Sequence, residues 1–135
     1  MLLPDWQIVE RGSGRVIVAQ LELADRPWSR LLGWQWRRPL DERCGLLIVP
    51  CRSVHTCFVR FALDLVGLDA SGRIASLELG LRPWRAAWCP RSVQAVLELP
   101  SPAGRSLAVG NRLQAVALNP ALPLIARASL RFLTS

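Results

Sequence analysis

The stretch CGLLIVPCRSVHTCFVRFALDLVGLDASGRI, residues 44–74, decides the fold of this chain. Its apolar residues form short runs broken by proline, serine and glycine, and this pattern favours buried strands. The stretch also holds three of the four cysteines, the only histidine and one acid, Asp64, inside an apolar run. An ionisable group is costly to bury unless it is paired or hydrogen-bonded. A compact functional site would therefore concentrate here.

Short apolar runs and turn signals continue on both sides of this stretch. The GSG run at residues 12–14 predicts a tight hairpin, and DASG at residues 69–72 predicts another turn. We expect strands at residues 6–10, 15–23, 46–49, 57–68, 73–81, 93–99, 107–109 and 113–118, and a loop at residues 82–92. Short strands at a turn spacing of about ten residues are typical of a sandwich or barrel. The sequence therefore predicts a single, mainly β domain over residues 1–135, ending in a basic tail at residues 119–135.

One short helix is expected near residues 26–33. Asp25 is suited to cap its N-terminus, and Pro27 fits its first turn. Trp28, Leu31 and Leu32 would form one apolar stripe. Because glycine readily ends a helix, we expect the helix to stop at the glycine of position 33.

Tryptophans gather in two segments, residues 28–36 and 84–88. Trp34 and Trp36 follow the predicted helix, and Trp84 lies in the proline-flanked loop. They could form an aromatic binding platform or fill the core, which is the commoner role of large aromatic residues. We take Trp34, Trp36 and Trp84 as candidate binding residues.

The chain is strongly basic, with a net charge of +7 at pH 7, and all its 17 basic residues are arginine. The arginines are scattered along the sequence, whereas a nucleic-acid interface needs several phosphate contacts from one surface. Specific nucleic-acid binding is therefore not expected. Pro4 and Asp5 interrupt any signal-peptide core, and no apolar run is long enough to span a membrane. These features predict a cytoplasmic protein whose cysteines are thiols.

The cysteines and the histidine allow a metal site or a nucleophilic pair. Cys51, His55 and Cys57 share strand parity, so an extended chain would place them on one face. A closed zinc site would need a fourth ligand, with Cys44 and Cys89 to spare. No CxxC motif is present, and core thiols beside a hydrogen-bonded histidine are the simpler interpretation. We favour no metal and expect no cofactor.

Asp64 lies between Leu63 and Leu65 and is expected to point toward an apolar face. Its structural role would be to accept hydrogen bonds from backbone N–H groups or to pair with an arginine. Its functional role would be that of a polar anchor in an apolar pocket. We favour the structural role and keep Asp64, with His55, as a candidate binding residue.

The order of these motifs resembles the bacterial and archaeal family called domain of unknown function 192. The matching segments are residues 30–34 (RLLGW), 44–48 (CGLLI), 53–56 (SVHT), 60–64 (RFALD), 69–74 (DASGRI) and 96–99 (VLEL). They span a family-like core of about residues 16–115. The chain departs from the family pattern at Val59, Ala62 and Asn111, where the family usually has Met, Pro and Asp.

The resemblance implies a compact jelly-roll-like sandwich or partly open barrel, and it implies no activity. Some members of the family are encoded near pilus or secretion genes. We therefore predict a non-enzymatic module that binds a protein or a small molecule and is accessory to such a system. The alternatives are an enzyme or metal protein centred on Cys51, His55, Cys57 and Asp64, and an arginine-rich nucleic-acid binder.

Overall fold

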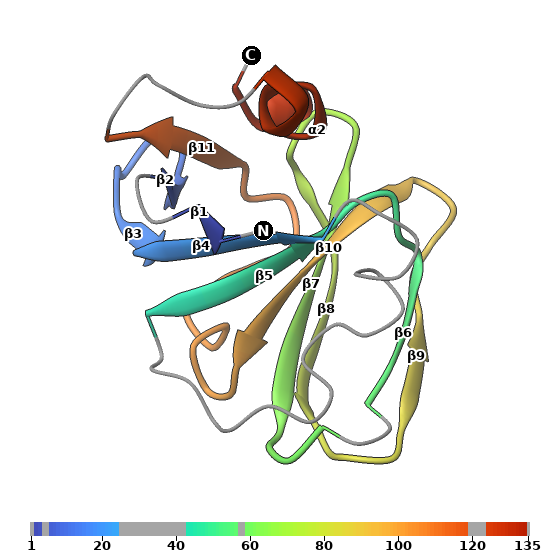
Figure 1. Cartoon of the computed structure of the whole chain (residues 1–135). Coiled ribbons are helices and arrows are strands. Elements are labelled where there is room, and N and C mark those ends of the chain that lie inside the picture. Colours follow the sequence, from blue (N-terminus) through green and yellow to red (C-terminus); the bar gives the residue numbers. More distant parts are fainter. Residues whose placement is uncertain (1, 4–5, 25–42, 57–58, 119–123, 135) are drawn as a thin grey trace.

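The computed structural model describes residues 2–3, 6–24, 43–56, 59–118 and 124–134 (Figure 1). The strands are β1 (Leu2–Leu3), β2 (Trp6–Glu10), β3 (Val16–Val18), β4 (Gln20–Ala24), β5 (Cys44–Ile48), β6 (Ser53–His55), β7 (Leu63–Asp69), β8 (Ile74–Leu81), β9 (Ala86–Trp88), β10 (Val93–Pro100) and β11 (Leu113–Ala117). The described helix is α2 (Leu124–Thr134). The predicted mainly β class is confirmed, and the described sheets are open.

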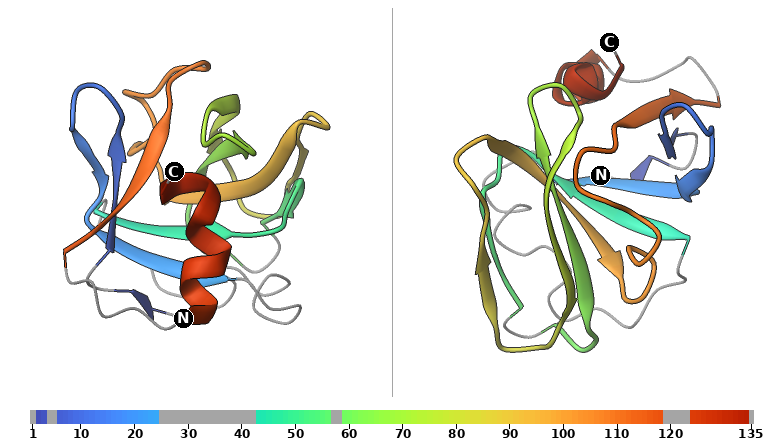
Figure 2. Two further views of the ribbon diagram at one scale, coloured as in Figure 1. Left: turned by 90° about the horizontal axis from the view of Figure 1, so that it is seen from above. Right: turned by 180° about the vertical axis from the view of Figure 1, so that it is seen from behind.

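The described strands form three sheets, and the largest of them lies at the centre. The central sheet has six strands in the order β1-β4-β5-β10-β7-β8, and β4 and β5 run parallel while its other neighbours run antiparallel. Strands β11, β2 and β3 form a second sheet, and β6 pairs with β9 alone. Figures 1 and 2 show the three-stranded sheet and α2 on one side of the molecule and the β6–β9 pair on the other.

Strands β5, β7 and β10 are buried on both faces, which explains their nearly continuous apolar sequence. One face packs in the first core cluster against the three-stranded sheet and α2. This cluster comprises Trp6, Ile8, Ile17, Val18, Leu21, Leu23, Leu47, Val66, Leu68, Ile74, Ala95, Leu97, Leu99, Leu107, Leu113, Ala115, Leu130 and Leu133. The other face belongs to the second core cluster, comprising Ala24, Leu46, Ile48, Val54, Val59, Leu63, Leu65, Val93 and Val96.

The glycine-rich turns fall where the sequence predicts them. Gly12 and Gly14 take positive φ angles of 100° and 72° between the antiparallel strands β2 and β3. Gly72 has a φ of 79° in the turn between β7 and β8. In that turn the Asp69 carboxylate accepts hydrogen bonds from Ser71 and the Arg73 backbone. Burial opposes ionisation of Asp69, but these hydrogen bonds and the Arg73 charge lower its pKa.

The expected single strand over residues 15–23 is wrong, because the chain changes sheets within it. Strand β3 pairs with β2, and β4 pairs with β5 in the central sheet. Ala19 lies between them, and its N–H donates to the Arg43 carbonyl at 2.7 Å. Ile17 and Val18 are both buried, so strict alternation fails at the point where the chain turns.

Two other predicted strands and the loop predicted over residues 82–92 need correction. The strand expected over residues 57–68 begins only at Leu63 in its described part, and residues 107–109 form no strand. Strand β9 lies inside the expected loop over residues 82–92, and β6 was not expected. Both are three residues long, which is too short for a clear period in the sequence.

The helix predicted near residues 26–33 lies outside the described residues. The helix that the structure describes is α2, within the basic tail. Leu130 and Leu133 of α2 are buried in the first core cluster, so the tail contributes to the core. Within the described residues, no helix is long and apolar enough to cross a membrane.

Candidate functional site

A large aromatic residue, Trp88, is exposed on the β6–β9 ribbon, which comprises residues Ser53–His55 and Ala86–Trp88. Trp88 lies directly opposite Ser53, and His55 lies opposite Ala86. These four residues are exposed, whereas Val54 is buried and Ala87 half-buried on the inner side. Side chains in register share one face of a strand pair. His55 and Trp88 are therefore neighbours on the outer face of the ribbon, where Trp88 is 79% exposed.

The loop that precedes β9 presents a second tryptophan from a constrained backbone. Trp84 is 59% exposed and has a φ of 63°, a conformation that residues other than glycine rarely adopt. Its N–H donates to the Thr56 carbonyl at 3.0 Å. Surrounding contacts must hold such a backbone in place.

Thr56 supplies these contacts from a fully buried position. Its hydroxyl donates to the Arg82 carbonyl at 2.6 Å and accepts from the Arg85 N–H at 2.8 Å. Its own N–H donates to the Arg85 carbonyl at 2.7 Å. Thr56 thus fixes the loop that carries Trp84, a role that sequence reasoning missed because the threonine follows a short, unrecognised strand.

Thr56→Val is expected to lower the free energy of unfolding by about 1–3 kcal/mol, because the Arg85 N–H and the Arg82 carbonyl lose the hydroxyl. Hydrogen exchange should become faster at residues 82–85. Thr56→Ser keeps the hydroxyl and should retain most of the stability. Urea denaturation and amide exchange measure both effects. Wild-type stability and exchange in the valine variant would contradict this role.

Asp64 is buried in β7 and both its carboxylate oxygens are used. Oδ1 accepts from the Gly80 N–H and Oδ2 from the Gly104 N–H, each at 2.8 Å. A Cβ at Gly104 would lie 2.9 Å from the Asp64 Cβ, so this approach requires glycine. These contacts match the favoured structural role: the carboxylate ties β8 and the loop after β10 to β7.

Glu98 is a buried acid that the sequence analysis did not single out. It lies in β10 between Leu46 of β5 and Leu65 of β7, on the face of the second core cluster. It is 2% exposed, and its Oε2 has no hydrogen-bond partner in the described structure. Burial raises the pKa of the Glu98 carboxyl to about 8. Its position between Leu97 and Leu99 was the available signal, since the same reasoning identified Asp64.

The remaining predicted ligands do not converge within the described residues. Cys51 packs against the second core cluster, and its thiol donates to the Ser53 carbonyl at 3.1 Å, whereas His55 faces outward. Cys57, Trp34 and Trp36 lie outside the described residues. In the part that the structure describes, no three histidine, cysteine or acidic residues lie close enough together to hold a metal ion.

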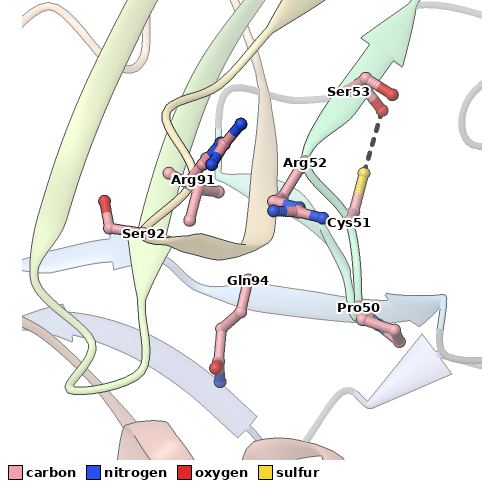
Figure 3. Close-up of a pocket in the computed structure, with 8 residues that line it drawn as sticks. Pro50, Cys51, Arg52, Ser53, Arg91, Ser92 and Gln94 are labelled. Atoms are coloured by element: carbon pink, nitrogen blue, oxygen red, sulfur yellow. Dashed lines mark hydrogen bonds between the residues drawn. The ribbon is translucent and has the colours of Figure 1, made fainter.

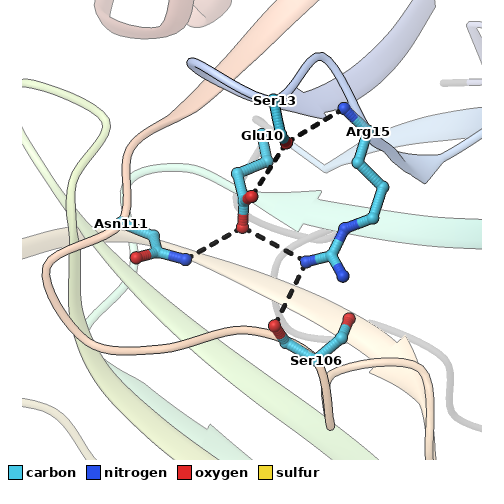
Figure 4. Close-up of polar contacts among 5 residues, drawn as sticks. All are labelled: Glu10, Ser13, Arg15, Ser106 and Asn111. Carbon is cyan, nitrogen blue, oxygen red and sulfur yellow. Dashed lines mark hydrogen bonds and ion pairs between the residues drawn. The ribbon is translucent and has the colours of Figure 1, made fainter.

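Asn111 takes part in a polar network with Glu10 and Arg15. Its side-chain amide donates to Glu10 Oε2 at 2.9 Å, which an aspartate could not do (Figure 4). Arg15 forms a 3.2 Å ion pair with the same oxygen and donates to the Ser106 carbonyl. Hydrogen bonding by Ser13 lowers the pKa of Glu10, with smaller contributions from Asn111 and Arg15 against the effect of burial. This network lies at the hairpin between β2 and β3, so we assign it a structural role.

The fold and these contacts define a small protein of open β sheets with a tryptophan-bearing ribbon on one side. The chain belongs to the DUF192 family, described as "Uncharacterized ACR, COG1430", whose model matches residues 8–115.

Similar proteins agree with this assignment. A UPF0127 protein of Pyrococcus furiosus is 30% identical over 106 residues, covering 75% of this chain and 90% of the relative. The crystal structure of a "putative transcription regulator" from Sinorhizobium meliloti matches with a TM-score of 0.72 and 22% identity, over 82% of this chain and 91% of that one. A protein of unknown function from Novosphingobium aromaticivorans gives a TM-score of 0.72 and 18% identity, over 84% of each chain. The two structures are similar to this chain in fold.

Proposed function

We propose that the protein is a non-enzymatic binding module that contacts a partner through the outer face of the β6–β9 ribbon and Trp84. The observation that carries this proposal is the exposure of Trp84 and Trp88, at 59% and 79%. Tryptophan is the residue type most enriched at binding hot spots, because it offers a large rigid surface with few torsions to restrict. His55 lies beside Trp88 on this face.

The charge around the ribbon favours an acidic partner. Arg82 and Arg85 are exposed on the loop that carries Trp84. The Arg85 guanidinium donates to the Trp84 backbone carbonyl at 3.3 Å, so the cation is held at the residue that carries the exposed indole. Arginine next to an exposed aromatic ring recognises carboxylate groups and flat apolar groups together. An acidic protein segment with apolar side chains has this chemistry, and a cytoplasmic location remains part of the proposal.

The two alternative functions receive less support from the geometry. An enzyme or metal protein would need Asp64, His55 and Cys51 to meet, yet Asp64 bonds two backbone N–H groups while His55 faces outward. A nucleic-acid binder would need a continuous arginine surface. The name of the Sinorhizobium meliloti protein concerns that protein, whose 22% identity supports a common fold. Specific nucleic-acid binding therefore stays outside the proposal.

Native mass spectrometry of the untagged protein from a mild extract of its own cells tests the proposed function. We expect an acidic protein bound to the wild type and lost from the Trp84→Ala/Trp88→Ala double variant. Val109→Ser is a matched control, because Val109 is a 62% exposed apolar residue elsewhere on the surface. Thermal melts of both variants should coincide with that of the wild type. Equal binding by the double variant, or a wild type without any bound protein, would contradict the proposal.

A further inference from the structure

A second feature of the same side of the molecule is a basic pocket beside the start of β6. It has a volume of about 580 Å³ and is lined by Pro50, Cys51, Arg52, Ser53, Arg91, Ser92, Val93 and Gln94 (Figure 3). Two chain segments form its walls: residues 50–53, which lead into β6, and residues 91–94, which lead into β10. This volume lies in the range of small-molecule sites.

Backbone hydrogen bonds connect the segments on either side of this pocket. The Cys51 N–H donates to the Gln94 carbonyl at 2.9 Å, and the Cys89 N–H donates to the Arg52 carbonyl at 2.8 Å. The Val93 N–H donates to the Pro90 carbonyl at 3.0 Å and closes the turn that carries Arg91. The backbone that carries Arg52 and Arg91 is therefore fixed before any ligand binds, so only their side chains need to be ordered on binding.

The lining is cationic and rich in hydrogen-bond donors. Each wall contributes one exposed arginine and one serine, and none of the described lining residues is acidic. Among the described residues, neither Arg52 nor Arg91 forms an ion pair; the ion pair seen there joins Arg15 to Glu10. Two guanidinium groups on one pocket thus keep their charge available to a ligand.

We propose that this pocket binds a small phosphate monoester. One arginine can satisfy a carboxylate through a bidentate contact, whereas two arginines match the nearly two negative charges and three terminal oxygens of a phosphate monoester. The hydroxyls of Ser53 and Ser92 are further donors on opposite walls. At about 580 Å³ the pocket is larger than an inorganic ion needs, which leaves room for the organic part of a ligand. This site goes beyond the proposed partner contact and does not depend on Trp84 or Trp88.

Isothermal titration calorimetry at low ionic strength tests the proposal with glycerol 3-phosphate, inorganic phosphate and acetate. We expect glycerol 3-phosphate to bind with one-to-one stoichiometry, inorganic phosphate more weakly, and acetate at least about tenfold more weakly than glycerol 3-phosphate. Tighter binding of inorganic phosphate than of glycerol 3-phosphate would overturn the assignment to an organic phosphate. Equal binding of acetate would overturn the phosphate class altogether.

Charge-matched variants separate this pocket from the overall positive charge. Arg52→Gln and Arg91→Gln should each weaken glycerol 3-phosphate binding by about tenfold or more, since each removes a charged hydrogen-bond donor. Arg105→Gln removes the same charge from an exposed position outside the pocket and should change the affinity less than twofold. Similar losses in all three variants, or no binding to the wild type, would overturn the proposal. The Trp84→Ala/Trp88→Ala variant should bind glycerol 3-phosphate normally, so failure of the partner contact and failure of this site are distinguishable.

Discussion

Asp64→Ala is expected to lower the free energy of unfolding by about 2–4 kcal/mol, one of the two largest effects predicted for this protein. Asp64 is 1% exposed, and its carboxylate accepts from the N–H groups of Gly80 and Gly104. Alanine would leave these two donors without their acceptor and would open a cavity beside β7. Urea denaturation at neutral pH measures the loss.

Asp64→Asn provides the matched comparison, because it keeps the shape and one acceptor oxygen. Its amide nitrogen cannot accept the second N–H, so we expect an intermediate loss of stability. Wild-type stability of both variants, together with loss of partner binding, would contradict the structural role. It would instead make Asp64 part of the binding site.

The second large effect concerns pH, and it arises from Glu98. In the folded protein burial raises the Glu98 pKa from 4.5 to about 8, so between these values the folded state binds more protons than the unfolded state. Stability from the protonated carboxyl is fully present below pH 4.5 and is lost as the pH rises through about 8. Because one pKa unit corresponds to about 1.4 kcal/mol, the total loss is expected to reach several kcal/mol.

Glu98→Gln should remove this part of the pH dependence, since glutamine does not titrate. Glu78→Gln, at an exposed position of β8, is the matched control and should keep the wild-type slope. The readout is the slope of unfolding free energy against pH between 5 and 9, from chemical denaturation at each pH. A slope that persists in the Glu98 variant would show that other groups cause it.

The sequence predicted the structure best where a residue's environment depends on its neighbours in the sequence. Strands β7 and β10 were evident because both of their faces are buried and their sequences are apolar throughout. Gly12 and Gly72 indicated turns because glycine readily adopts positive φ angles, and both residues have them in the structure. Asp64 was identified as a hydrogen-bonded buried acid because an ionisable group inside an apolar run needs a partner.

Features that depend on distant segments could not be predicted. The break at Ala19 follows from its contact with Arg43, which no local pattern announces. The two walls of the basic pocket lie about forty residues apart in the sequence, so Arg52 and Arg91 read as scattered arginines. Thr56 gains its role only because β6 pairs with β9, which brings it to the Arg82 carbonyl far along the sequence. The family resemblance, by contrast, was readable from motif order alone, and the match over residues 8–115 confirms it.

The position of β10 in the sheet also governs the order in which this protein can assemble during its synthesis. β10 is the strand that joins β5 to β7, yet it comes after both of them in the chain. The ribosome therefore releases β5 and β7 with unpaired edges, and these apolar strands cannot close into one sheet until Val93–Pro100 has emerged. β11, which completes the sheet containing β2, emerges later still. Nascent chains that end before Val93 should therefore aggregate or bind chaperones.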